Sequence, residues 1–203
     1  MTRRSSDAGI VHRVRGLIAL PVVVALLQLA GCANLQMGQP KVTVENAAAI
    51  RSAGLSPMAV GSFSADPAKG SELDHGVSIR TNSLTSPVGG SFAQYLRETL
   101  SVELASAGLL DPGANTTVTG VLSNSEVNAP IGTGTASLGA RFKVERAGAV
   151  RYDKQLGVDA QWESHFVGAV AIPQAAGQYE ALYRKLVAKL LTDPAFRAAV
   201  TQP

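Results

Sequence analysis

The chain has 203 residues, of which 46% are hydrophobic, 16% charged and 5% aromatic, and its formal net charge is +3. Charged residues are scarcer than the roughly 25% of an average globular protein, which excludes a disordered polyelectrolyte and a protein that neutralises long stretches of phosphate. A single cysteine excludes an internal disulfide framework and a cysteine-only zinc site.

Residues 1–31 have the three parts of a secretion signal. Basic residues, among them Arg13 and Arg15, precede an apolar run of 13 residues from Leu17 to Leu29, and small residues follow it. A helix that spans a bilayer needs about 20 residues, so a cleaved signal is a better interpretation than a permanent transmembrane helix.

The end of this run carries a more specific signal, because the string Leu29-Ala30-Gly31-Cys32 resembles the lipobox of bacterial lipoproteins. The resemblance implies cleavage between Gly31 and Cys32, and a diacylglycerol on the Cys32 sulfur. Two or three acyl chains, at about 0.8 kcal/mol per buried methylene, would hold the chain stably on a membrane. Ala33 follows the cysteine in place of an aspartate, which in lipoproteins of this kind favours the periplasmic side of the outer membrane. A chance cysteine after an ordinary signal is the alternative.

The mature chain is formally neutral. Removing residues 1–31 takes away four arginines and one aspartate, and it leaves 14 basic and 14 acidic side chains. The basic character therefore belongs to the leader, and we expect the folded part to bind no nucleic acid.

Residues 32–56 are small, mixed and weakly patterned, and we interpret them mainly as a lipidated tether. A flexible segment of about 20 residues spans roughly 25 Å, enough to lift a domain clear of the lipid headgroups. The alternation around Val42 and Val44 leaves an edge strand open as an alternative.

The predicted domain begins with two short strands and a helix. Met58–Phe63 and Gly76–Arg80 are short apolar runs between turn-rich segments, which is typical of buried strands. Ser91 is a good N-cap with Gln94 three residues later, so a capping box begins a helix that Gly108 ends. The apolar residues of this helix recur every four positions: Phe92, Leu96, Leu100 and Leu104.

Strict alternation of apolar and polar residues then predicts three antiparallel strands, at about 117–122, 135–145 and 155–163. A turn at Arg146-Ala147-Gly148 joins the last two as a hairpin. The inward side chains of the three strands would be Val118, Gly120, Leu122, Ala136, Leu138, Ala140, Phe142, Val144, Leu156, Val158, Ala160 and Trp162.

A second amphipathic helix begins near Pro173 or Gln174 and ends near Thr192, and Asp193-Pro194 starts a short terminal helix. This order of elements predicts a single α+β domain over residues 57–203. We expect a two-layer sandwich, in which a mainly antiparallel sheet is covered by two helices on one face.

Two histidines are the candidates for catalysis in the mature chain. His75 follows Glu72 and Asp74, but this cluster matches no zinc motif. His165 follows Ser164, and neighbours in a strand point to opposite faces, so these two cannot form a nucleophile and its base. We therefore predict no metal site, no cofactor and no enzymatic activity.

Two glycine-rich segments and an aromatic set are weaker candidates. Gly89-Gly90-Ser91 enters a helix N-terminus, which can bind anions, but it lacks the lysine of a P-loop and is interpreted as a flexible cap. Gly132-Thr133-Gly134 lacks the rest of a dinucleotide motif, so we expect a mobile loop. Trp162, Tyr179 and Tyr183 could line a groove, but their periodicity favours the core.

As a whole, this layout resembles the small periplasm-facing lipoproteins of Gram-negative outer membranes, of the YajG-like kind. The leading hypothesis is a non-enzymatic envelope accessory that is held in the membrane by acyl chains on Cys32 and binds an envelope protein, a glycolipid or a polysaccharide. A second is a subunit of an envelope transport system that carries a lipid or hydrophobic ligand between its sheet and helices. Its pocket would be lined by Phe142, Leu156, Val158 and Leu186. A hydrolase built on His75 or His165 is the third.

Overall fold

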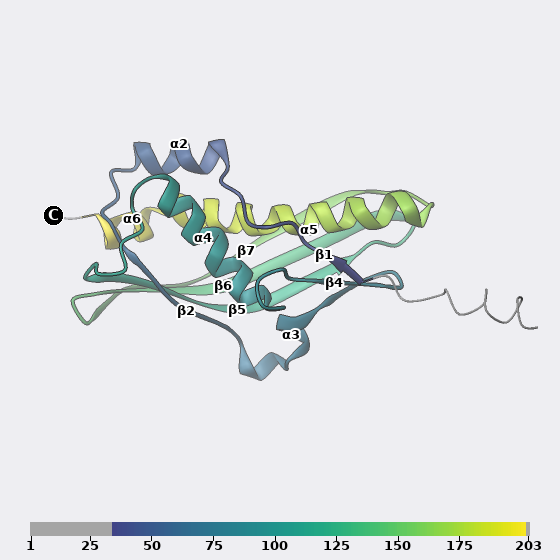
Figure 1. The fold of residues 1–203 in the computed structure, drawn as a ribbon, viewed down its shortest axis with the longest axis horizontal. Coiled ribbons are helices and arrows are strands. Elements are labelled where there is room, and N and C mark those ends of the chain that lie inside the picture. The colour runs from purple at the N-terminus through teal and green to yellow at the C-terminus, as the bar shows by residue number, and fades with distance from the viewer. Residues whose placement is uncertain (1–33, 202–203) are drawn as a thin grey trace, which may run out of the picture. The chain divides into compact units, whose positions relative to one another are not determined.

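The computed structural model describes residues 34–201 (Figure 1). Its larger sheet has four strands in the spatial order β2 (Ala59–Ala65), β5 (Thr116–Asn128), β6 (Gly132–Arg146) and β7 (Ala149–Ser164). β2 runs parallel to β5, whereas β5, β6 and β7 are antiparallel. The three predicted strands and their hairpin are thus confirmed.

The hairpin between β6 and β7 turns at Ala147 and Gly148, whose φ angles of 50° and 78° lie in the left-handed region. Two central residues with positive φ make the tight turn whose twist matches that of the flanking strands. The turn brings Arg146 opposite Ala149, and a register shift between Val144 and Glu145 then sets which β7 residues face the core.

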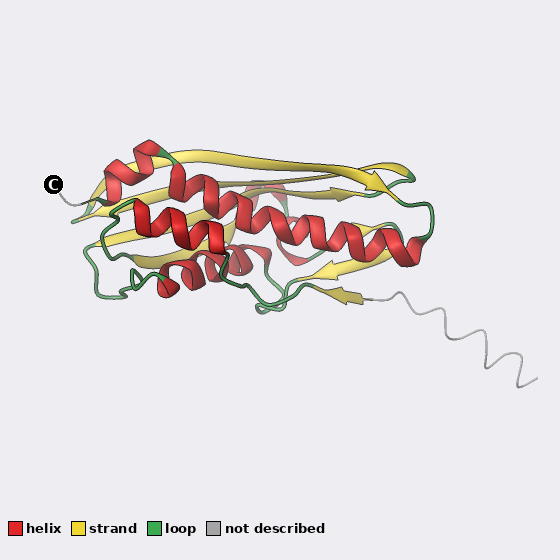
Figure 2. Cartoon of the chain, turned by 90° about the horizontal axis from the view of Figure 1, so that it is seen from above, coloured by secondary structure: helices red, strands yellow, loops and turns green. Residues whose placement is uncertain are grey.

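Helices cover one face of this sheet (Figure 2). They are α4 (Phe92–Ser106), α5 (Gly168–Thr192) and α6 (Pro194–Val200). α4 packs mainly on β2, and α5 packs on β6 and β7. The apolar sides of these helices meet the inward strand residues in one core, where Leu100, Phe142 and Leu186 are fully buried. The α+β fold with a mainly antiparallel sheet covered by helices is confirmed.

Both ends of α4 lie where the sequence predicts them. The hydroxyl of Ser91 accepts a hydrogen bond from the backbone nitrogen of Gln94 at 3.1 Å. Gly108, with a φ of 71°, ends the helix in the left-handed conformation. The Gln94 side chain does not complete a capping box, because its Nε2 donates to the carbonyl oxygen of Phe63 at 2.7 Å and ties α4 to β2.

The structure adds a second, three-stranded sheet. Its strands are β1 (Asn34–Gln36), β4 (Asn82–Thr85) and β3 (Val77–Ile79), in that spatial order. β1 runs parallel to β4, and β3 is antiparallel to β4. A 3-10 turn at Pro67–Lys69 and the short helix α3 (Glu72–His75) precede it. The fold therefore has two mixed sheets where the sequence predicts one.

The segment predicted as a tether, residues 32–56, differs from that prediction where the structure describes it. After β1, helix α2 (Val44–Ser52) packs on α4 and α5. Its buried residues are Asn46, Ala47 and Ile50. Val42 and Val44 are exposed and do not form the edge strand that was the alternative to the tether. The sequence indicates helix α2 only weakly, because its alanines contribute little to an apolar stripe.

Two further boundaries differ from the prediction. α5 begins at Gly168, five residues before Pro173, and its first turns bury Ala171. Pro173 lies inside the helix, where it donates no backbone hydrogen bond. Gly132-Thr133-Gly134, predicted as a mobile loop, is the paired beginning of β6. Gly134 lies there because the Trp162 ring occupies the space that a Cβ would need.

Candidate functional site

The predicted lipid attachment residue Cys32, the cleavage position after Gly31 and the signal peptide of residues 1–31 lie outside the described residues. The described chain begins at Asn34, in β1. Across residues 34–201, no helix combines the length and the apolarity that crossing a membrane requires.

The two histidines lie on different elements, one in α3 and the other after β7. The Nδ1 of His75 is 3.4 Å from the carbonyl oxygen of Gly90. The Nδ1 of His165 accepts a hydrogen bond from the backbone nitrogen of Val167 at 3.0 Å, and its ring stacks on Phe166. Within the described range, no group of three or more His, Cys, Asp or Glu side chains is placed to hold a metal ion.

The carboxylate of Asp74 occupies the position at the start of α4 where an anion could bind. The Oδ1 of Asp74 accepts hydrogen bonds from the backbone nitrogen of Ala93 at 2.8 Å and from the Ser91 hydroxyl at 3.0 Å. A negative charge at a helix N-terminus is stabilised by the free amides and the helix dipole. An external anion would have to displace Asp74.

The aromatic set predicted for the core lies there. Tyr179 and Tyr183 are fully buried, and Trp162 is only 9% exposed. The Tyr179 hydroxyl oxygen lies 2.6 Å from the Ser125 hydroxyl and 2.7 Å from the Tyr183 hydroxyl. Burial raises the pKa of both tyrosine hydroxyls, so both keep their protons and remain hydrogen-bond donors.

A bulge in β5 brings Ser125 to this cluster. The pairing of β5 with β6 shifts register between Leu122 and Asn124, so one extra residue interrupts the alternation. Ser125 then faces the helices and is buried, whereas Glu126 is exposed on the other face.

The space that a carried ligand would need between the sheet and the helices is filled by side chains. Phe142 and Leu186 are fully buried, Leu156 is 5% exposed, and Val158 packs against the same core. Hollows on the surface of the described residues are lined by other residues. The residues predicted to line a pocket are therefore core residues.

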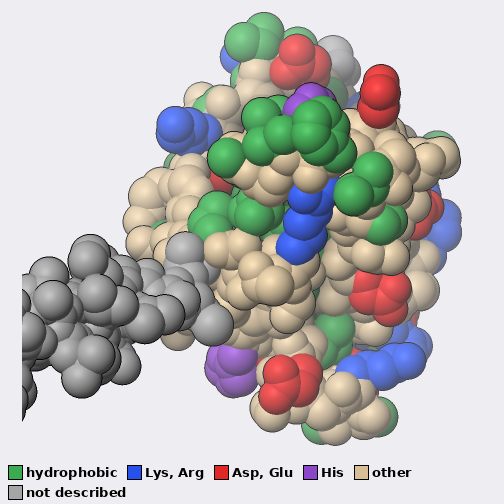
Figure 3. Space-filling view, turned by 90° about the vertical axis from the view of Figure 1, so that its right-hand side faces the viewer, with side chains coloured by type: hydrophobic (Ala, Val, Ile, Leu, Met, Phe, Trp, Pro, Cys, Tyr) green, Lys and Arg blue, Asp and Glu red, His purple; other side chains and the backbone are tan. Residues whose placement is uncertain are grey.

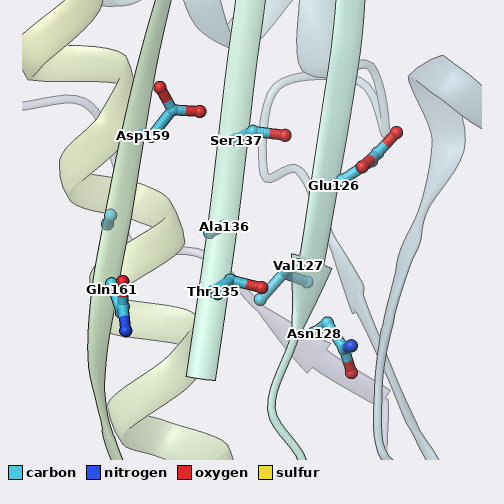
Figure 4. Close-up of a pocket in the computed structure, with 9 residues that line it drawn as sticks. Glu126, Val127, Asn128, Thr135, Ala136, Ser137, Asp159 and Gln161 are labelled. Carbon is cyan, nitrogen blue, oxygen red and sulfur yellow. The ribbon is translucent and has the colours of Figure 1, made fainter. Parts of the chain in front are cut away.

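One of these hollows lies on β5, β6 and β7, on the side of the sheet that the polar residues occupy. This groove has a volume of about 640 Å³ (Figure 4). Its lining residues are Glu126, Val127, Asn128, Thr135, Ala136, Ser137, Asp159, Ala160 and Gln161.

The strand register arranges the polar side chains of the groove in two rows. Ser137 pairs with Glu126 on one side and with Asp159 on the other, and these three form the first row (Figure 4). The second row is Asn128, Thr135 and Gln161. They are the polar half of the alternation, so they point away from the core.

The chemistry of the first row is that of a hydrogen-bonding and charge-pairing surface. The carboxylates of Glu126 and Asp159, on either side of Ser137, are hydrogen-bond acceptors with negative charge. Asn124 donates from Nδ2 to that hydroxyl at 2.7 Å and holds it in place. The same alternation of apolar and polar residues that predicts the core also marks these outward residues.

A second, smaller hollow of about 330 Å³ lies on the same face and contains Arg141, Lys143 and Asp153. The Arg141 guanidinium donates two hydrogen bonds to Asp153, at 2.5 and 2.9 Å, and these hold the pKa of that carboxyl below its usual range. The charges in this hollow are thus paired within the chain.

Comparison with known proteins shows likeness at the level of structure. No family model and no curated protein sequence matches the chain. Protein XCC0632 from Xanthomonas campestris, described under the family model DUF330, is 9% identical over 81% of this chain and 92% of its own, with a TM-score of 0.52. A candidate lipoprotein from Caulobacter crescentus matches over 75% of this chain and 98% of its own, at 16% identity and a TM-score of 0.44.

A minor lipoprotein from Acinetobacter baumannii matches over 68% of this chain and 93% of its own, at 10% identity and a TM-score of 0.35. At these identities a structural match speaks for fold and not for activity. The chain therefore shares its fold with the Xanthomonas protein.

Proposed function

We propose that this protein is a lipid-anchored lipoprotein on the periplasmic side of the outer membrane, and that it acts there as a non-enzymatic binding module. One observation carries the binding role: helices cover one face of the four-stranded sheet, while the other face presents the two polar rows of the groove. Anchoring rests on the lipobox-like string that ends at Cys32.

The chemistry of the groove favours a basic protein surface as the partner. Glu126 and Asp159 place two carboxylates within one row, about 10 Å apart across three strands. Lysine or arginine side chains of a partner would pair with them, whereas the phosphates of a glycolipid would be repelled. An envelope protein is therefore the partner that this face fits best.

The anchor is tested by metabolic labelling with a palmitate analogue. The wild-type protein should incorporate the label and sediment with outer membranes, whereas Cys32→Ser should lose both properties. Retention of the label in Cys32→Ser would refute the attachment site.

The binding face is tested by site-specific crosslinking in intact cells. A photo-crosslinking amino acid at Gln161, in the groove, should capture a discrete protein, whereas the same residue at the exposed Lys185 of α5 should not. Replacing both carboxylates, in Glu126→Gln with Asp159→Asn, should reduce the captured yield without changing the melting temperature. Equal yields from Gln161 and Lys185, or capture of glycolipid alone, would contradict the proposal.

A further inference from the structure

Exposed apolar side chains gather at one end of the four-stranded sheet. Ile131 is 73% exposed, Phe166 68%, Val170 50% and Val167 38%, and we term these four residues the apolar tip. Figure 3, which looks at this end, shows hydrophobic side chains grouped beside a basic one. The other large apolar residues exposed in the described range are Val42, Val44, Leu110 and Val150. A concentrated apolar patch of this kind marks an interaction site.

Strand pairing brings the parts of the apolar tip together. Gly132 pairs with Ser164, so the loop before β6 lies beside the segment that follows β7. Ile131 belongs to the first of these and Phe166 to the second. Val167 is the N-cap of α5, and Val170 lies in its first turn.

Arg80, in the turn between β3 and β4, holds this end in place. Its guanidinium donates hydrogen bonds to the carbonyl oxygens of Ala129 at 2.9 Å, His165 at 2.6 Å and Phe166 at 3.2 Å. Its φ of 57° is unusual for a residue other than glycine, and the three hydrogen bonds offset that cost. The apolar tip is thus a fixed surface, although its side chains are exposed.

The described chain begins at the same end. Asn34, the first residue of β1, pairs with Ser83, which lies three residues after Arg80. Only Ala33 lies between Asn34 and Cys32, and two consecutive peptide units span at most about 7 Å in any conformation. A lipid on Cys32 would therefore be attached within about 7 Å of Asn34, on the sheet whose β3–β4 turn carries Arg80.

The charges at this end suit a membrane surface. The segments that carry the apolar tip and the turn that holds it, residues 79–82, 129–132 and 164–170, contain no aspartate or glutamate. They contain Arg80, which contacts the carbonyl oxygens of His165 and Phe166. Glu163, three residues before Phe166, is exposed on the polar face of β7. Apolar and aromatic side chains beside basic ones are typical of surfaces that lie in the headgroup region of a bilayer.

We propose that the apolar tip inserts into the headgroup region of the same leaflet that holds the acyl chains of Cys32, and that it orients the domain on the membrane. This inference rests on the proposed lipid anchor. The strands run away from the tip, and a 16-residue strand such as β7 is about 50 Å long. The groove then lies close to the membrane, and the strands that form it run roughly along the membrane normal. The β6–β7 turn projects into the periplasm.

The test uses the complete acylated protein in vesicles of phosphatidylethanolamine and phosphatidylglycerol. Since the Cys32 thiol carries the lipid, a single cysteine introduced as Phe166→Cys can be labelled with an environment-sensitive fluorophore. Val150→Cys is the matched control, because Val150 is 54% exposed beside the turn at the opposite end of β7. Both positions are exposed, so neither substitution should affect folding.

The fluorophore at position 166 should shift its emission to shorter wavelength in vesicles, and spin-labelled lipids should quench it. The fluorophore at position 150 should show neither effect. Emission typical of water at both positions, in protein that retains its palmitate label, would overturn the inference and leave the anchor intact. Protection of position 166 only in cells, and not in pure lipid, would assign the apolar tip to a protein partner. Loss of the palmitate label would refute the anchor itself.

Discussion

The Oε1 atom of Glu103, in α4, lies 2.9 Å from the hydroxyl oxygen of Thr43, which stands 60 residues earlier in the chain, and accepts its hydrogen bond. The same oxygen accepts hydrogen bonds from the Thr43 backbone nitrogen at 3.0 Å and from Asn46 Nδ2 at 2.9 Å. Glu103 is fully buried and Thr43 is the N-cap of α2. One carboxyl oxygen therefore fixes the beginning of α2 to α4.

Glu103→Ala should lower the free energy of unfolding by about 2–4 kcal/mol, because one buried donor and two part-buried donors lose their acceptor. Glu103→Gln keeps an acceptor oxygen at the same position and should cost less. Urea unfolding measures both effects, and hydrogen exchange should show faster exchange of the α2 amides in Glu103→Ala. Unchanged protection of α2 in that variant would show that apolar packing alone holds this helix.

The contact of Glu103 with Thr43 also shows why part of the fold could not be predicted from the sequence. Each element that buries one face could be predicted, because its apolar residues recur at the spacing of a strand or a helix. These elements are β5, β6, β7, α4 and α5. α2 is alanine-rich and depends on an acceptor 60 residues away, which no local pattern reveals. The polar rows were visible as residue types, but only the register set by the β5 bulge places Glu126 beside Ser137.

Gly134→Ala should destabilise the protein by about 1–3 kcal/mol, because a Cβ at Gly134 would overlap the ring of Trp162. The ring must move, so the fluorescence emission of this single tryptophan should shift as well. Gly157→Ala is the matched control, since its Cβ would come no closer than 3.7 Å to the carbonyl oxygen of Leu138. Equal stability of the two variants, measured by urea unfolding, would argue against close packing of the Trp162 ring on Gly134.

Tyr179→Phe should cost more stability than Tyr183→Phe. The Tyr179 hydroxyl bridges Ser125 and Tyr183, so its removal leaves two buried hydroxyls without this partner. Removal of the Tyr183 hydroxyl leaves the pair of Tyr179 and Ser125 intact. We expect about 2 kcal/mol for the first variant and about 1 kcal/mol for the second. Thermal unfolding of both variants in parallel decides the order, and a larger loss in Tyr183→Phe would contradict the bridging role.

The stability of the C-terminal junction should depend on pH through Asp193. Its Oδ2 accepts a hydrogen bond from Lys154 Nζ at 2.6 Å, and its Oδ1 caps α6 by accepting from the backbone nitrogens of Ala195 and Phe196. The Lys154 hydrogen bond, together with these backbone hydrogen bonds, holds the pKa of Asp193 below its ordinary value. The unfolded chain therefore binds the proton more readily than the folded protein does.

It follows that Asp193 stabilises the fold above the pKa of an unfolded aspartate, about 3.9, and that this contribution is lost as the pH falls through the lower folded-state pKa. Asp193→Asn keeps the cap of α6 but removes the charge. We expect it to cost about 1 kcal/mol or less at pH 7, because the Lys154 ammonium is half exposed, and to unfold with a weaker dependence on acid. Urea unfolding at several pH values between 3 and 7 measures this difference, with Asp159→Asn in the exposed groove as the control. If Asp193→Asn lost stability on acidification as steeply as the wild type, the Lys154 contact would not be the source of that dependence.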